Sequence, residues 1–142
     1  MREILFRGKR VDNGEWISGS ILSFDDGGKV ILSSTAKVFK EHGTTTICCN
    51  ECYDVYPETV GQYTGLTDKN GVKIFEGDIV AYNKEYGGET REKGTVYWCD
   101  GAFWVENVQD EEDYSLLGAL VKYRLEIISN IHDNPGLLEE KK

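Results

Sequence analysis

The 142-residue chain lacks the hydrophobic runs of membrane and exported proteins. No stretch of about 18 apolar residues occurs, which excludes a membrane-spanning helix. The first residues contain only one short apolar run, Ile4 to Phe6, which is too short for the apolar region of a signal peptide. We therefore expect a protein of the cytoplasm.

Residues that would build a catalytic site are also scarce. The two histidines, His42 and His132, belong to no H-E-x-x-H motif, and no G-x-S-x-G sequence occurs. The contiguous acidic run 110–113 predicts a solvated loop, because four consecutive side chains converge on one ion only in a special turn. Glu76 and Asp78, two apart on an extended chain, leave weak cation binding open. We predict no enzyme, no catalytic residue and no cofactor.

The cysteines do not form a complete metal-binding pattern. Cys48, Cys49, Cys52 and Cys99 should be reduced thiols in the cytoplasm. Only Cys49 and Cys52 have the C-x-x-C spacing, whereas a structural zinc site usually takes two such pairs. No βαβ pattern surrounds the motif, which argues against a redox role. We interpret the thiols as buried or incidental and predict no metal site, with zinc as the open alternative.

Excess negative charge is concentrated in the second part of the chain. Residues 1–55 contain seven Lys and Arg against eight Asp and Glu, a net charge of -1, and residues 56–142 contain nine against seventeen, a net charge of -8. Nucleic-acid binding depends on cations that displace counterions from phosphates. The acidity therefore argues against a nucleic-acid partner, although Arg7, Lys9 and Arg10 leave a local basic patch open.

Apolar and polar residues alternate at every second position over much of the chain, which predicts β-strands separated by turns. Residues 110–123 break this alternation and predict a short helix or a structured loop. Residues 35–55 are ambiguous, with either irregular structure or one strand near Thr45 to Cys48. The other expected strands are residues 2–10 and 15–24 as a hairpin, 29–34, an approach strand after Val60, 78–83, 94–108 as a hairpin about Asp100-Gly101, and 124–131.

Short strands with turn signals about every ten residues are typical of β-barrels and sandwiches. The segment from Val60 to Ile131 has five expected strands in about seventy residues, which is the size of an SH3-like barrel. We predict a mainly β protein with an N-terminal β-hairpin region, residues 1–55, and an SH3-like β-barrel domain, residues 56–142.

The glycine-rich stretch QYTGLTDKNGVKIFEGDIV, residues 62–80, is not a phosphate-binding loop. A P-loop needs G-x-x-x-x-G-K-[ST] before a helix, and here the spacing is one residue too long and a strand follows. Gly65, Gly71 and Gly77 instead predict turns with positive φ or close backbone approach. Asn70-Gly71 favours a type I′ turn, and Asp78 is expected to bind backbone amides of its own loop.

Three motifs resemble those of the YopX family of small phage and prophage proteins. They are ILFRGKRVDNGEW near the start, ETVGQYTGLTDKNGVKIFEGDIV in the middle and EIISNIHDNPGLL near the end, in the family's order and spacing. Ser129 stands where Gly is expected and Gly136 where Glu is usual. The resemblance implies an SH3-like barrel and a phage or prophage origin. It implies no established activity and no catalytic residues.

Aromatic residues are the best candidates for a binding surface. Tyr97, Trp98, Phe103 and Trp104 share one predicted hairpin, and Tyr82 lies on the strand before it. On a two-faced strand half of these side chains should fill the core, and the others form a possible partner-binding surface.

These features together predict a non-enzymatic phage or prophage accessory protein of the host cytoplasm. It would act by protein–protein interaction with an unidentified partner, or by self-assembly as a homo-oligomer. The alternative is a nucleic-acid-related role, as an acidic mimic of DNA or a weak nucleic-acid binder.

Overall fold

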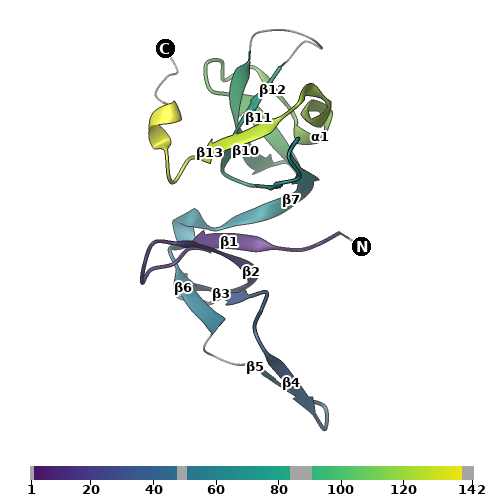
Figure 1. Ribbon diagram of the computed structural model, residues 1–142. Coiled ribbons are helices and arrows are strands. Elements are labelled where there is room, and N and C mark those ends of the chain that lie inside the picture. Colours follow the sequence, from purple (N-terminus) through teal and green to yellow (C-terminus); the bar gives the residue numbers. More distant parts are fainter. Residues whose placement is uncertain (1, 48–50, 84–90, 139–142) are drawn as a thin grey trace. The chain divides into compact units, whose positions relative to one another are not determined.

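The computed structural model describes residues 2–47, 51–83 and 91–138. The chain divides into two compact units, which we call the N-terminal unit (Met1–Gln62) and the C-terminal unit (Tyr63–Lys142). Both are built mainly of antiparallel strands (Figure 1). The boundary expected after residue 55 therefore falls inside the N-terminal unit.

The N-terminal unit is an antiparallel sheet with neighbours in the order β6-β3-β2-β1-β7. The predicted hairpin over residues 2–24 is confirmed as β1 and β2, and the predicted third strand as β3. Ile31 and Val55 are buried in its small core. The elements are β1 (Phe6–Lys9), β2 (Trp16–Ser23), β3 (Lys29–Ser33), β6 (Cys52–Val55), the 3-10 helix η2 (Pro57–Thr59) and β7 (Gly61–Thr67), whose first two residues pair with β1.

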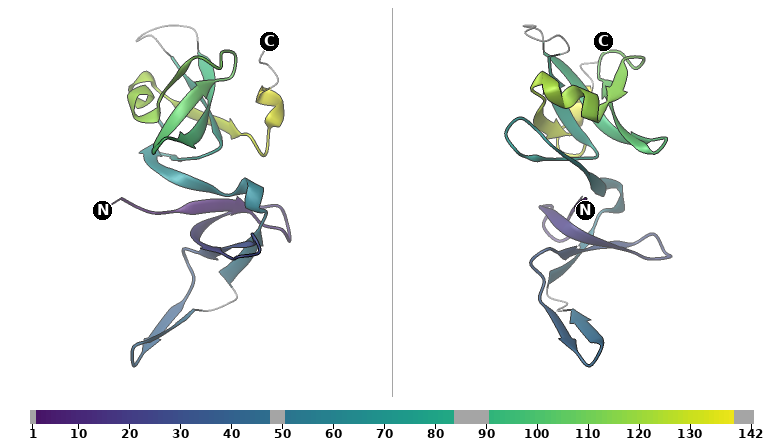
Figure 2. Two further views of the ribbon diagram at one scale, coloured as in Figure 1. Left: turned by 180° about the vertical axis from the view of Figure 1, so that it is seen from behind. Right: turned by 90° about the vertical axis from the view of Figure 1, so that its right-hand side faces the viewer.

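A separate two-stranded hairpin leaves this sheet between β3 and β6. It consists of β4 (Val38–Glu41) and β5 (Thr44–Ile47), which pair with each other (Figures 1 and 2). Its turn has positive φ at His42 and Gly43, which is the type I′ geometry of tight hairpins. Every residue of β4 is exposed. The sequence predicted only the second of these strands.

The C-terminal unit is centred on a five-stranded antiparallel sheet with the order β12-β11-β10-β9-β13. The predicted hairpin about Asp100-Gly101 is confirmed, with positive φ at both turn residues. The elements are β8 (Lys73–Phe75), which pairs with β7, β9 (Asp78–Tyr82), β10 (Glu92–Cys99), β11 (Ala102–Asn107), β12 (Tyr114–Leu116), the helices α1 (Leu117–Leu120) and η3 (Val121–Tyr123), β13 (Glu126–Asn130) and the 3-10 helix η4 (Pro135–Leu138).

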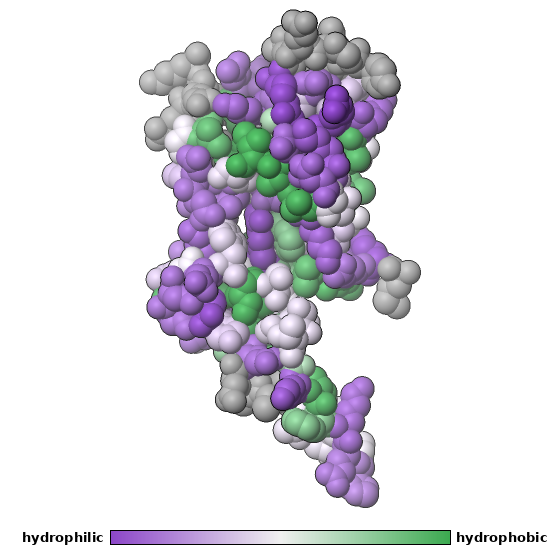
Figure 3. Space-filling model, viewed as in Figure 1, coloured by the Kyte–Doolittle hydropathy of each residue, from purple (hydrophilic) through white to green (hydrophobic). Residues whose placement is uncertain are grey.

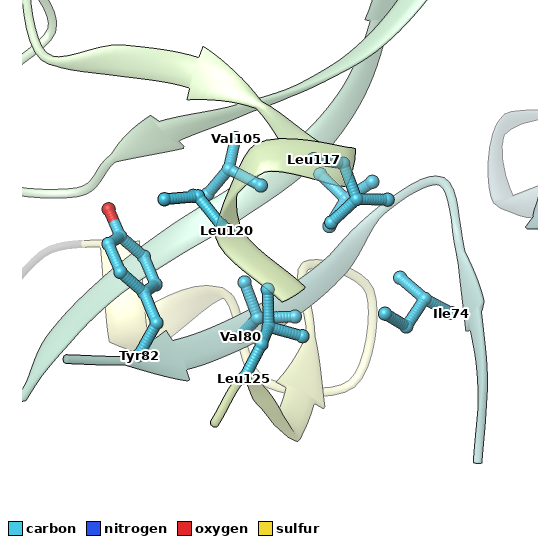
Figure 4. Packing of buried hydrophobic residues seen from close by; sticks show 8 residues of the cluster. Ile74, Val80, Tyr82, Val105, Leu117, Leu120 and Leu125 are labelled. Atoms are coloured by element: carbon cyan, nitrogen blue, oxygen red, sulfur yellow. The ribbon is translucent and has the colours of Figure 1, made fainter. Parts of the chain in front are cut away.

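The core of the C-terminal unit lies between this sheet, β8 and the short helix α1. Figure 4 shows Leu117 and Leu120 of α1 pointing toward the sheet residues Val80 and Val105. These side chains are buried, and about 1.5 to 3 kcal/mol is gained for each aliphatic side chain removed from water. Of the helix or structured loop expected for residues 110–123, residues 117–120 form the helix α1, which covers the core. In Figure 3 hydrophilic residues surround small hydrophobic areas on the face shown.

The strand order of this sheet ends at two edges, β12 and β13. Among the described strands these edges do not pair with each other, so the backbone ladders form an open sheet. The prediction of a mainly β protein is confirmed, whereas the closed SH3-like barrel is not. No helix in the described part of the chain has the length and hydrophobicity needed to cross a bilayer.

A buried carboxylate, Asp68, organises the glycine-rich stretch. One of its oxygens accepts hydrogen bonds from the amides of Asn70 (2.8 Å) and Val72 (2.9 Å), and the other from Ile127 (3.1 Å). Gly71 has a φ of 80°, but Asn70 does not have positive φ, so the predicted type I′ turn is wrong. The Asp68 side chain holds both amides in a different turn.

The other expectations for this stretch are confirmed. Gly65, Gly71 and Gly77 all have positive φ, which a residue with a Cβ atom adopts only at a cost. The carboxylate of Asp78 accepts a hydrogen bond from the Phe75 amide at 2.7 Å, as expected for an aspartate that binds its own loop. Asp78 is 1% exposed and is part of the fold.

We predict that Asp68→Asn lowers the free energy of unfolding of the C-terminal unit by about 2 to 3 kcal/mol. The amide accepts with only one oxygen and brings its own donors toward the amides that Asp68 now satisfies. Urea unfolding at neutral pH measures the change. Asp110→Asn is the matched control, because Asp110 is exposed and its carboxylate accepts the nearby Glu112 amide. Equal losses in the two variants would contradict the role given to Asp68.

We also predict an acid dependence of stability that comes from Asp68. Burial raises the pKa of this carboxyl, and the amides of Val72, Ile127 and Asn70 overcome that effect and bring the pKa below its ordinary value. The unfolded chain then binds the proton more readily than the folded chain. The stabilisation is complete above the unfolded pKa and is lost as the pH falls through the folded pKa.

The free energy of unfolding should therefore decrease between about pH 5 and pH 2, and less steeply in Asp68→Asn. Chemical unfolding over this pH range compares the two proteins. If the free energy of unfolding fell equally steeply with pH in the two proteins, Asp68 would contribute nothing to the acid dependence.

Candidate functional site

The antiparallel register divides the candidate aromatic residues between two faces of the sheet. Tyr97 on β10 lies opposite Trp104 on β11, and Trp104 lies opposite Leu116 on β12. Successive side chains of a strand point to opposite faces. The neighbours Val96 and Val105 are buried in the core, so Tyr97 and Trp104 point away from it. We call Tyr97, Trp104, Tyr114 and Leu116 the outer row.

The outer row is held in place by contacts of its own. The Trp104 indole donates a hydrogen bond from Nε1 to the Cys99 carbonyl at 2.9 Å, and its ring meets Tyr114 edge-on at a centroid distance of 5.7 Å. Tyr114 is 57% exposed and Leu116 46% exposed. Burial and the neighbouring Glu106 raise the pKa of Tyr97, which keeps its phenol neutral. The row is an ordered apolar surface that is open to solvent.

The remaining candidates lie elsewhere. Trp98 and Phe103 are opposite each other on the core side of the hairpin, with their rings edge-on at 4.8 Å. Phe103 packs against the core cluster, whereas Trp98 is 51% exposed. Tyr82 is 3% exposed and belongs to the core, where burial raises the pKa of its phenol. Tyr82 is therefore not part of an exposed surface, because β9 is buried along its whole length.

An acidic turn precedes the outer row. Asp110, Glu111 and Glu112 are exposed in the connection from β11 to β12, as the solvated-loop interpretation predicts. Buried Asn107 orders this turn: its Nδ2 donates to Asp113 at 3.2 Å, and its Oδ1 accepts from the Gln109 amide at 2.8 Å. Negative charge therefore borders the outer row at Tyr114.

Within the described residues, the candidate metal ligands are not brought together. In residues 2–47, 51–83 and 91–138, no group of three or more His, Cys, Asp or Glu could hold a metal ion. Cys52 and Cys99 are free and lie in different units. Partial desolvation and Asp100 raise the pKa of the Cys99 thiol, which disfavours the thiolate that binds metals. Cys48 and Cys49 lie outside the described residues, so the zinc alternative stays a prediction.

The basic residues near the N-terminus are engaged with aromatic rings. Arg7 and Lys9 lie over the ring of Trp16, at 4.8 and 5.6 Å from its centroid. Arg10 lies 3.9 Å from the centroid of Tyr53, and its guanidinium also donates two hydrogen bonds to Asp12. Each cation therefore already has an aromatic partner.

The comparisons agree with the resemblance seen in the three motifs. The family model described as YopX protein matches residues 5–139. The chain belongs to the YopX family. No curated protein matches it.

Two solved structures are similar over almost the whole chain. The crystal structure of protein EF1440 from Enterococcus faecalis is 28% identical, with a TM-score of 0.66 over 97% of this chain and 99% of that chain. The crystal structure of protein yopX from Bacillus subtilis is 16% identical, with a TM-score of 0.53 over 97% of each chain, and shows likeness of fold alone.

Two surface features do not follow from the sequence alone. Tyr114 and Leu116 join the outer row through β12, which the sequence placed in a helix or loop. Their alternation about Ser115 was the available signal, but three residues are too few to distinguish a strand. The exposed hairpin β4–β5 was missed in part, although His42-Gly43 occupies its tight turn.

Proposed function

We propose that this YopX-family protein is a non-enzymatic accessory protein of a phage or prophage, which acts in the host cytoplasm by binding another protein through the outer row. The phage context is what the family resemblance implies. The single observation that supports a binding role is the ordered apolar surface of the outer row, in which Tyr114 and Leu116 are exposed and Tyr97 and Trp104 are half-buried. As part of this proposal, we interpret the C-terminal unit as an SH3-like fold.

Residue type and rigidity both favour recognition at this surface. Tyr and Trp are enriched among the residues that dominate binding energy at interfaces. Trp104 is fixed by its hydrogen bond to Cys99 and by the ring of Tyr114, so little side-chain freedom remains to be lost on binding. Edge strand β12 also offers backbone groups to an extended partner segment.

The charge around the outer row supports a basic partner. Glu106 lies opposite Tyr114, and the acidic turn 110–113 leads directly into β12. Aromatic faces attract Lys and Arg through cation–π contacts, and neighbouring carboxylates add to that attraction. We therefore assign the outer row to a basic, arginine-containing segment of a protein partner.

We expect that an affinity pull-down from host cells that carry the phage recovers one protein with a basic segment. Trp104→Ala should reduce its recovery at least about tenfold, because a buried Trp anchor contributes 2 kcal/mol or more. A synthetic peptide of the partner's basic segment, titrated against purified protein, measures the same loss directly.

Trp98→Ala is the matched control for this experiment. It removes an indole from the same hairpin but from the opposite face, and Trp98 is the more exposed of the two, so binding should be unchanged. Circular dichroism confirms that both variants are folded. Equal effects of the two substitutions, or a partner without a basic segment, would contradict docking at the outer row.

Self-assembly is a second candidate, supported by the hairpin β4–β5. An isolated two-stranded hairpin is marginally stable in water, and this one exposes Val38 and Phe39. Pairing with the same hairpin of a second copy would cover these side chains and extend the two-stranded sheet.

Light scattering after gel filtration should then give a dimer mass at micromolar concentration, and Phe39→Ser should shift the mass to that of a monomer. Leu22→Ser is the control, because Leu22 is also exposed in the N-terminal unit but lies on β2. A monomeric wild-type chain would exclude self-assembly through this hairpin and would not bear on partner binding at the outer row.

A further inference from the structure

A basic hollow lies in the otherwise acidic C-terminal unit. It has a volume of about 220 Å³ and is lined by Lys69, Asn83, Arg91 and Arg124. Drug-sized ligands occupy roughly 300–1,000 Å³, so this hollow fits a smaller group. Its three cations come from separate parts of the sequence, within a segment whose net charge is -8. Only the fold brings them together.

One carboxylate neutralises part of this charge. Oε2 of Glu126 lies 3.2 Å from Nζ of Lys69 and 3.0 Å from Nη1 of Arg91. The hydrogen bonds from Arg91 and Lys69 lower the pKa of Glu126, so it stays ionised at neutral pH. No carboxylate within the described ranges pairs with Arg124. Among the described residues, the three lining cations and the Glu126 carboxylate sum to a formal charge of +2.

Main-chain hydrogen bonds hold the lining residues in position. The Lys69 amide donates to the Leu125 carbonyl at 2.9 Å, and the Asn83 amide donates to Tyr123 at 3.2 Å. Arg91 donates from Nη2 to the Ala81 carbonyl at 3.2 Å. The three segments that carry the cations are thus joined through backbone groups, so the charges are preorganised.

One polar atom of the hollow is not satisfied by the described fold. Arg124 ends the helix η3 with a φ of 56°, a left-handed conformation that commonly terminates helices and that Gly adopts without strain. The buried Oδ1 of Asn83 has no hydrogen-bond partner in the part of the chain that the structure describes. Unsatisfied buried polar atoms occur preferentially at binding sites.

We propose that this hollow is a binding site for a small oxyanion of the phosphate class, held by Arg124, Arg91 and Lys69. Arginine forks and a lysine ammonium match the oxygens of a phosphate group. Asn83 lines the hollow beside these cations. The site is separate from the outer row and does not depend on the proposed function.

The surrounding charge selects a compact anion over a nucleic-acid strand. Exposed charges act over a Debye length of about 8 Å at physiological ionic strength. A single phosphate in the hollow is governed by the local charge of +2. A polyanion would extend over a segment that carries seventeen Asp and Glu, and would be repelled by it.

Titration with inorganic phosphate at constant ionic strength and neutral pH, followed by amide chemical shifts of the full chain, tests the site. We expect saturable shifts at Lys69, Asn83 and Leu125. Arg124→Gly should weaken phosphate binding about three- to tenfold through loss of one charged contact. The same variant should unfold at an unchanged or higher temperature, because Gly suits the left-handed position.

Glu126→Gln should change the affinity for phosphate in the opposite direction from Arg124→Gly. Removing the competing carboxylate should strengthen phosphate binding about three- to tenfold. Lys122→Gln is the control: it removes one positive charge, as Arg124→Gly does, but Lys122 lies over the Tyr123 ring and outside the hollow. It should leave phosphate binding unchanged.

Several results would overturn the proposal. They are a phosphate titration without saturable shifts, equal weakening by Lys122→Gln and Arg124→Gly, or loss of affinity in Glu126→Gln while the variant stays folded. A short DNA duplex is titrated in parallel. If the duplex binds through Arg124 whereas phosphate does not, the site belongs to nucleic acid and the proposal of a small oxyanion is wrong.

Discussion

A single buried carboxylate links the local turn of the glycine-rich stretch to the end of the sheet. Asp68 is 7% exposed, and it accepts amides from its own turn and from Ile127 at the start of β13. An ionised group so far from water is tolerated only when donors surround it. The three amides meet that need, and they are thereby brought together from positions distant in the sequence. Edge strand β13 and the basic hollow both depend on this link.

The sequence could predict structure that depends on neighbouring residues alone. The hairpin of β10 and β11 follows from alternation and from Asp100-Gly101, which the structure places in the expected turn. Asn70-Gly71 is a similar dipeptide, yet its turn is different, because the Asp68 carboxylate captures the amides of Asn70 and Val72. A side chain two residues away outweighs the local preference. Strands β4, β6 and β12 were missed because they are short and are defined by their pairing partners.

The candidate surfaces depend on register and tertiary packing, which the sequence does not show. Aromatic enrichment pointed to the correct hairpin, but a shift of one residue decides whether a side chain belongs to the core or to the surface. Tyr97 is therefore on the outer row while its neighbour Trp98 is not. The basic hollow has no sequence signature, because Lys69, Arg91 and Arg124 are separated by long segments and each appears singly in an acidic background.

The two proposed surfaces would let one acidic unit attract ligands of opposite charge. The net charge governs approach from a distance, and it favours a basic partner at the outer row. Within a Debye length the local arrangement dominates instead, and a preorganised set of cations can bind an anion that the whole unit would repel. Such a site needs rigid support, because cations on flexible side chains would separate or pair with nearby carboxylates. The backbone bonds at Lys69, Asn83 and Leu125 provide that support, and the Asp68 carboxylate holds the same segments in place.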